Sequence, residues 1–160
     1  MADKKITDVT YTSELTSNDS IFINQDNHLK QINKNDLFLP PQNKILWEGS
    51  HYMNATQTID LSEPISAQEH GVILVWSAYA DNTPQNYNWN YFFIPKFHVL
   101  YHNGNGIECL CGHATTIISK YVYVSDTQIQ GNERNSNASF SLNGYTVNNQ
   151  LAVLRYVIGV

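Results

Sequence analysis

The sequence predicts an all-β protein, an antiparallel β-sandwich of jelly-roll type preceded by a small N-terminal hairpin. Two observations support this fold class. From Asn43 to Val160, alternating or apolar stretches follow one another at short intervals, and no helical period extends beyond two turns. Between these stretches lie segments rich in asparagine and glycine, which accept the positive φ angles of tight turns: DNTPQN, HNGNG, QGNERNSN and LNGY.

A proline pair divides the chain. Its 160 residues are enough for one ordinary hydrophobic core. Pro40 and Pro41 hold the backbone extended and donate no backbone hydrogen bond, so they interrupt regular structure. We therefore predict an N-terminal segment over residues 1–39, a linker over residues 40–43 and a β-domain over residues 44–160.

The N-terminal segment is predicted to form a hairpin. Ser20 to Asn24 and His28 to Ile32 have the pattern of two strands, with QDN as the turn between them, and Lys34 to Phe38 fits a single helical turn. A two-stranded hairpin is only marginally stable alone in water. We therefore expect this segment to attach to a partner.

The β-domain contains two strongly apolar stretches. GVILVWSAYA is apolar on both faces up to Trp76, which predicts a central strand, whereas KILWEGSHYM and TQTIDL alternate as half-buried strands do. The last stretch, QLAVLRYVIGV, is almost wholly apolar. It is predicted to lie inside the sheet and not at its edge.

The charge pattern excludes several classes of function. Only 14% of residues are charged, the formal net charge is −5, and lysine and arginine are scattered, so the chain lacks the basic cluster that nucleic acids require. No apolar run reaches the roughly 18 residues of a membrane span, and the first residues lack the apolar core of a signal peptide. Synthesis in a cytosol is expected, and two cysteines fit a reducing compartment.

The run NYNWNYF contains rings at every second position. If it is one strand, Tyr87, Trp89, Tyr91 and Phe93 share one face and the asparagines share the other. We favour burial of the rings, because large aromatic side chains dominate protein cores. The alternative exposes some of the rings as platforms for the apolar faces of sugars, with nearby amides binding hydroxyl groups.

Candidate ligand-binding residues lie where strands give way to loops, because loops carry binding functions more often than strand interiors do. Trp76 and Tyr79 precede the DNTPQN loop. With the neighbouring amides and rings, the predicted ligand-binding set is Trp76, Tyr79, Asn82, Asn86, Tyr87 and Trp89.

The segment IECLCGH places Cys109, Cys111 and His113 on one strand face. Cysteines two residues apart in a strand are too distant for a disulfide, and three residues on a straight strand do not converge on a tetrahedral metal. We predict buried thiols and no metal site within one chain. In a symmetric oligomer, His98 and His102 could meet their copies on a three-fold axis and bind an ion there.

No catalytic motif is present. The sequence lacks a G-x-S-x-G elbow, an H-E-x-x-H pair and a phosphate-binding loop, and its carboxylates form no pair that sequence alone identifies. We predict that the protein is not an enzyme and binds no cofactor. A carbohydrate depolymerase is the least favoured of the alternatives that we carry forward.

Two parts of the sequence resemble structural proteins of bacteriophages and prophages of Gram-positive bacteria. The opening KKITDVTYTSELTSNDSIFINQDNHLKQINKNDL looks like the N-terminal module of tail or fibre proteins. GVILVWSAY, NYNWNYFFIPK and VLRYVIGV are similar to segments of C-terminal domains in the same group. The resemblance covers nearly the whole chain, and IECLCGH departs from its pattern.

The resemblance implies a virion protein, made in the host cytoplasm, that attaches to other virion proteins by its N-terminal segment and presents its β-domain outward. A homotrimer is expected, with Tyr91, His98 and His102 as predicted interface residues. The β-domain of a tail-fibre or baseplate protein would bind cell-wall polysaccharide. The alternative is a head fibre, decoration or connector protein without a glycan ligand.

Overall fold

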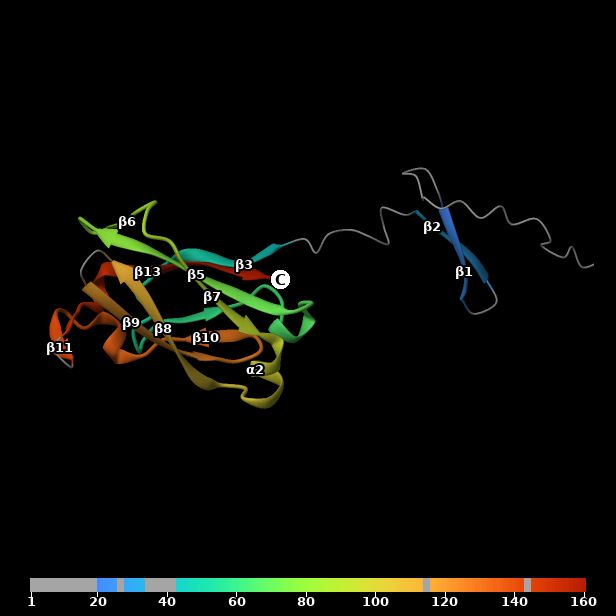
Figure 1. Ribbon diagram of the computed structural model, residues 1–160. Helices are drawn as coiled ribbons and strands as arrows, with labels where there is room; N and C mark the ends of the chain where they lie inside the picture. The colour runs from blue at the N-terminus through green and yellow to red at the C-terminus, as the bar shows by residue number, and fades with distance from the viewer. Residues whose placement is uncertain (1–19, 26–27, 34–42, 114–115, 143–144) are drawn as a thin grey trace, which may run out of the picture. The chain divides into compact units, whose positions relative to one another are not determined.

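The computed structural model describes residues 20–25, 28–33, 43–113, 116–142 and 145–160. The chain forms two compact units, Met1–Pro40 and Pro41–Val160. The described residues are mostly β-structure with antiparallel sheets, as the sequence predicts, and they include one short α-helix (Figure 1).

The first unit contains the predicted hairpin. Strands β1 (Ser20–Gln25) and β2 (His28–Asn33) pair antiparallel, with Ser20 opposite Asn33 and Gln25 opposite His28. The two predicted strands are therefore confirmed. The helical turn predicted for Lys34 to Phe38 lies outside the described residues.

The second unit contains a five-stranded sheet built around its C-terminal strand. β13 (Ala152–Gly159) pairs antiparallel with β3 (Lys44–His51) on one side and with β5 (Gly71–Ala80) on the other. The far side of β5 pairs with β7 (Asn90–Pro95) along its first part and with the two residues of β6 (Thr83–Pro84) at its end. The prediction that the C-terminal strand lies inside the sheet is confirmed.

The second sheet of this unit is organised by one long strand, β9 (Thr116–Val124). β8 (Asn105–His113) pairs with the whole length of one side of β9. The other side pairs with two short strands, β10 near the C-terminal end of β9 and β12 in parallel near its start, and these pair in turn with β4 and β11. The bounds of these strands are Gln128–Gln130 for β10, Tyr145–Val147 for β12, Thr58–Asp60 for β4 and Phe140–Leu142 for β11.

Short helical segments connect the strands. α2 (Lys96–Tyr101) follows β7 directly, and three 3-10 turns are η1 (Ile65–Ala67), η2 (Glu133–Ser136) and η3 (Asn149–Leu151). The β5–β6 hairpin turns through Asp81 and Asn82, whose φ angles are 52° and 59°. Two consecutive positive φ angles define the type of tight turn that matches the twist of paired strands. Aspartate and asparagine adopt positive φ angles more readily than most residues.

The two sheets contribute to one hydrophobic core. The five-stranded sheet supplies Val72, Leu74, Trp76, Ile94, Leu154 and Val157, and the six-stranded sheet supplies Ile59, Cys109, Cys111, Ile118, Val122, Val124 and Ile129. Each fully buried aliphatic side chain stabilises the fold by roughly 1.5–3 kcal/mol relative to an exposed one. Val72, Leu74 and Trp76 of β5 and Ile118, Val122 and Val124 of β9 therefore contribute much of the stability of this core.

Candidate functional site

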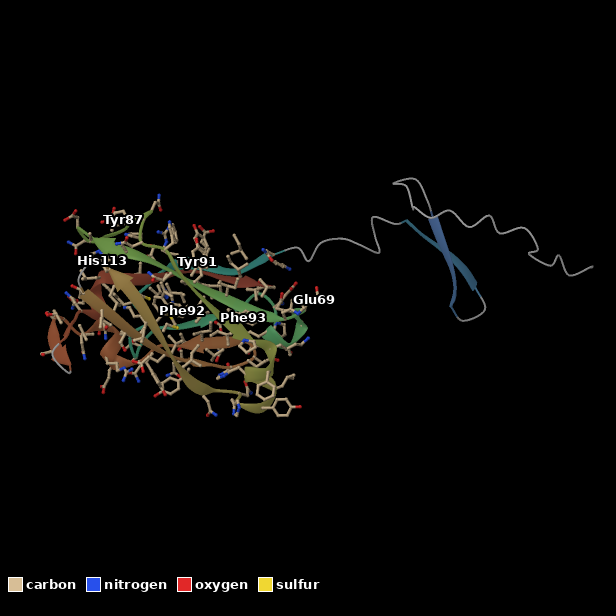
Figure 2. The ribbon with its side chains drawn as sticks, in the orientation of Figure 1. Glu69, Tyr87, Tyr91, Phe92, Phe93 and His113 are labelled. Atoms are coloured by element: carbon tan, nitrogen blue, oxygen red, sulfur yellow. The ribbon has the colours of Figure 1, made fainter. Side chains whose placement is uncertain are left out.

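The outer face of the five-stranded sheet carries exposed aromatic rings. In β7, the side chains of Tyr91 and Phe93 are 63% and 54% exposed, whereas Phe92 and Ile94 contact the core (Figure 2). The predicted burial of Tyr91 and Phe93 is therefore wrong. The reason lies in the pairing with β5, which places Ile94 opposite Val72 and Phe92 opposite Leu74, so the even-numbered side chains of β7 join the buried row.

The ring-rich run is not one strand. β7 begins only at Asn90, and Tyr87 and Trp89 belong to the loop before it. Asn88 has a φ of 53°, which interrupts the extended backbone. The loop is attached to the end of β5, because the Ala78 amide donates to the Tyr87 carbonyl at 3.1 Å. The prediction of a single four-ring strand face is thus corrected.

Loop and sheet together form a shallow apolar hollow of about 280 Å³. Val75, Trp89, Tyr91, Tyr156 and Ile158 line it, and we name these five residues the aromatic hollow. The indole of Trp89 stacks on the ring of Tyr156, with ring centroids 6.2 Å apart and an interplanar angle of 27°. The hollow therefore joins a residue of the ligand-binding set, Trp89, to one predicted for an oligomer interface, Tyr91.

A β-bulge places a cation beside these rings. In the pairing of β13 with β5, Leu154 lies opposite Trp76 and Tyr156 opposite Val75, which leaves Arg155 as the extra residue on this side of β13. The Arg155 guanidinium lies 5.7 Å from the ring centroids of both Trp89 and Tyr156. Its Nε donates to the Gly49 carbonyl at 3.2 Å. These contacts position the cation and support the stacked pair through cation–π attraction.

The remaining predicted ligand-binding residues lie in different surroundings. Trp76 is fully buried in the core, so its assignment to a surface site is wrong, because the even-numbered residues of β5 face inward. Tyr79 is half-buried and packs edge-on against Tyr52, with centroids 4.9 Å apart. Asn82 and Asn86 are exposed, and Asn82 forms the tip of the β5–β6 turn.

Helix α2 presents a second apolar surface. Phe97, Leu100 and Tyr101, which we name the α2 patch, are all more than half exposed, with Tyr101 at 70%. The rings of Phe97 and Tyr101 stack with centroids 4.5 Å apart. The predicted interface residues His98 and His102 lie on and directly after the same helix, with ring centroids 6.1 Å apart.

Sequence reasoning missed a fully buried lysine. Lys120 points from β9 into the core, between the rings of Tyr52 and Trp76, at 5.3 Å and 5.5 Å from their centroids. Its ammonium group donates to three backbone carbonyls, those of Tyr52 at 3.3 Å, Asn135 at 2.8 Å and Asn149. Three donors therefore meet three acceptors. The available signal was a single charged residue within an otherwise uncharged strand, TIISKYVYV.

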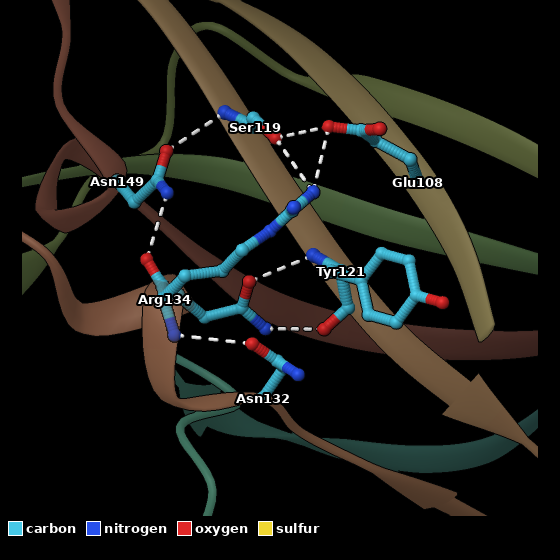
Figure 3. Close-up of polar contacts among 7 residues, drawn as sticks. Glu108, Ser119, Tyr121, Asn132, Arg134 and Asn149 are labelled. Atoms are coloured by element: carbon cyan, nitrogen blue, oxygen red, sulfur yellow. Dashed lines mark hydrogen bonds and ion pairs between the residues drawn. The ribbon is translucent and has the colours of Figure 1, made fainter.

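Two fully buried asparagines complete the edge of β9 between β10 and β12 (Figure 3). The Asn149 side-chain oxygen accepts from the Ser119 amide at 2.8 Å. The Asn135 side chain accepts from the Tyr121 amide at 2.7 Å and donates to the Tyr121 carbonyl at 2.6 Å. These two side chains form the hydrogen bonds that a neighbouring strand would otherwise form with β9. They satisfy backbone groups that would otherwise be buried without partners.

An exposed ion pair lies beside this network (Figure 3). Arg134 donates to the Glu108 carboxylate at 2.8 Å and to the Ser119 hydroxyl at 3.3 Å, and the same hydroxyl donates to Glu108. The guanidinium also lies 4.9 Å from the centroid of the Tyr121 ring. Both charged side chains are more than a third exposed, so the pair adds little to stability.

The two thiols are buried and free, and burial raises the pKa of Cys109 and of Cys111 to about 12. Burial also raises the pKa of the Tyr52 phenol to about 12, with a further contribution from Tyr79. Among the residues that the structure describes, no three histidine, cysteine, aspartate or glutamate side chains are grouped to hold a metal ion. None of the described helices is long and apolar enough to cross a membrane.

Lys120 makes stability depend on pH. Burial lowers its pKa from 10.5 to about 7, so between these values the unfolded chain binds more protons than the folded one, and stability rises with pH. The raised thiol pKa values act in the opposite direction above about 9. From about pH 7 to about pH 8.5 we expect a gain on the order of 1 kcal/mol in the free energy of unfolding, measured by urea denaturation.

The matched control for this pH dependence is Lys120→Met, which removes the titrating group. Its free energy of unfolding should not rise over the same pH range. A profile of the parent protein that is flat or falls between these pH values would contradict the assignment.

No family model matches the chain, and no curated protein matches it at a significant level.

Proposed function

We propose that the chain is a virion structural protein of a bacteriophage or prophage of Gram-positive bacteria, of the tail-fibre or baseplate type, whose β-domain binds host cell-wall carbohydrate through the aromatic hollow. The observation that supports this proposal most directly is the stacked Trp89–Tyr156 pair with Tyr91 exposed beside it. Two sheets that share one core favour the finer description of the domain as an antiparallel sandwich of jelly-roll type.

The chemistry of the aromatic hollow fits a sugar. Flat rings offer area to the apolar C–H face of a pyranose, and the stacking of Trp89 on Tyr156 of β13 orders these rings before a ligand binds. The adjoining loop exposes the amides of Asn86 and Asn88, which can both donate to and accept from hydroxyl groups. Arg155 is held by the Gly49 carbonyl and the two rings, so it adds a positive charge at a fixed position beside the hollow.

Replacing Trp89 with leucine should abolish most of the binding to purified Gram-positive cell walls, because it removes the stacking surface while keeping an apolar side chain on Tyr156. The affinity should fall at least about tenfold, because the free energy of one aromatic stacking contact is of that size. Pull-down with cell-wall preparations measures it.

Leu110→Ser is the matched control, since Leu110 is an exposed apolar residue of β8 outside the aromatic hollow. This variant should bind like the parent protein. Equal binding by Trp89→Leu and the parent, with both folded, would remove the aromatic hollow from the proposal.

The proposal includes a homotrimer, which would multiply a weak single-site affinity. The α2 patch supports it, because contiguous exposed apolar surface marks association sites and identical faces can bury one another around an axis. His98 and His102 would lie at this seam, as predicted.

We expect light scattering to give a mass near three chains, and we expect the double variant Leu100→Ser with Tyr101→Ser to shift the mass to one chain. These side chains are exposed in the single chain, so their removal should leave the fold intact. A parent protein that is monomeric at all concentrations would exclude the trimer.

A head fibre, decoration or connector protein is the second candidate. The separate N-terminal unit supports this candidate as well as it supports the tail-fibre or baseplate protein. In both cases residues 1–39 would bind other virion proteins. Labelled full-length protein scored on host cells and on particles lacking fibres separates the two candidates. Attachment to particles without binding to cells supports the second, and binding to cells supports the first.

A further inference from the structure

A second hollow lies on the six-stranded sheet, apart from the aromatic hollow on the five-stranded one. Its volume is about 480 Å³, and its lining is Gly104, Tyr123, Ser125, Gln128 and Gln130, which we name the glutamine hollow. None of these five side chains carries a charge. The lining combines one aromatic ring with two amides and a hydroxyl group.

The walls of the glutamine hollow are held together by backbone hydrogen bonds. The Gly104 amide donates to the Val124 carbonyl at 2.8 Å, which connects the turn after α2 to the end of β9. Ser125 and Gln128 close the β9–β10 turn, with the Ser125 amide donating to the Gln128 carbonyl at 2.9 Å and the Gln128 amide to the Ser125 hydroxyl at 3.2 Å. The hollow is therefore preformed.

Its aromatic wall is fixed and partly accessible. The Tyr123 ring is 36% exposed and meets the Tyr121 ring edge-on, with centroids 5.4 Å apart. The Tyr123 hydroxyl accepts from the Asn132 side-chain amide at 3.3 Å, which leaves its own proton for an acceptor. A ligand can therefore pack on this ring and accept a hydrogen bond from its hydroxyl group.

The amides define the chemistry of the ligand. Gln128 donates from Nε2 to the Asp60 carboxylate at 2.7 Å, which orients its side-chain carbonyl as an acceptor. Gln130 offers both donors and an acceptor from the neighbouring strand position, opposite Tyr123. A hydroxyl group both donates and accepts hydrogen bonds, so a site that offers acceptors beside donors suits a hydroxylated ligand. The negative charge of the nearby Asp60 carboxylate disfavours binding of an anion.

We propose that the glutamine hollow is a binding site for a neutral saccharide unit, distinct from the aromatic hollow. This inference rests on the proposed function in its choice of a saccharide as the hydroxylated ligand. Two saccharide sites on different sheets would let one β-domain hold two segments of wall polymer.

The test is a titration of full-length, nitrogen-15-labelled protein with D-glucose, D-galactose and N-acetyl-D-glucosamine, followed by amide NMR spectra, with glycerol at equal molarity as the control polyol. We expect at least one sugar to shift the backbone signals of Gly104 and Ser125 and the side-chain amide signals of Gln128 and Gln130. Gln130→Ala and Tyr123→Ala should weaken this binding by about tenfold or more. Gln150→Ala, a change of an exposed glutamine outside the hollow, should leave it unchanged.

The inference would be overturned by no shifts at these residues with any sugar, by equal shifts with glycerol, or by sugar shifts that survive both Gln130→Ala and Tyr123→Ala. Shifts confined to Trp89 and Tyr91 would also overturn it and would leave the proposed function standing. Shifts confined to the glutamine hollow would support the inference and count against the aromatic hollow.

Discussion

Removal of residues 155–160 is expected to leave no cooperatively folded β-domain. These residues form most of β13, which is the only strand of the described chain that pairs with both β3 and β5. Their loss separates the five-stranded sheet and removes the fully buried Val157 from the core. A domain has only about 5–15 kcal/mol of net stability, and loss of two strand ladders together with core surface exceeds it.

Circular dichroism and thermal melting measure this effect. The control is deletion of residues 2–7, which removes the same number of residues from the other compact unit and should leave the melting of the β-domain unchanged. A soluble truncated protein that melts in one sharp transition would show that β13 is dispensable.

Lys120→Met is expected to destabilise the β-domain by about 3 kcal/mol. Methionine has a similar length, so it fills the space, but it leaves the carbonyls of Tyr52, Asn135 and Asn149 without their donor. A buried acceptor that loses its partner costs roughly 1 kcal/mol or more, and three are affected. The shift of the urea midpoint measures the change.

Lys44→Met is the matched control, because Lys44 is an exposed lysine paired only at the surface, with Glu63. Its free energy of unfolding should change by less than about 1 kcal/mol. If Lys120→Met were as stable as the parent protein, the cost of burying the cation would outweigh its three hydrogen bonds.

Strand positions could be predicted from the sequence, but the exposed face of β7 could not. Turn residues located the hairpin of β1 and β2, and apolar runs located β5 and β13, because both signals are local properties of the sequence. In NYFFIP, however, both alternating sets are apolar, so the pattern does not say which one is buried. The register with Val72 and Leu74 decides it, and register is a long-range property.

The buried polar network was also beyond prediction. Lys120 lies 15 residues from Asn135, 29 from Asn149 and 68 from Tyr52, and these partners come together only when η2 and η3 fold onto β9. A lone lysine in a strand is ordinarily expected at the surface. Two residues of the aromatic hollow were singled out from the sequence in different roles, Trp89 as a ligand-binding residue and Tyr91 as an interface residue, whereas Tyr156 joins them only through its position on β13.

The two asparagine side chains that complete β9 have a consequence for association between molecules. An uncovered strand edge offers a row of donors and acceptors on which a foreign chain can polymerise. At Ser119 and Tyr121 that row is already occupied by Asn149 and Asn135. The backbone groups of Ser119 and Tyr121 are therefore not free to pair with a strand of another molecule.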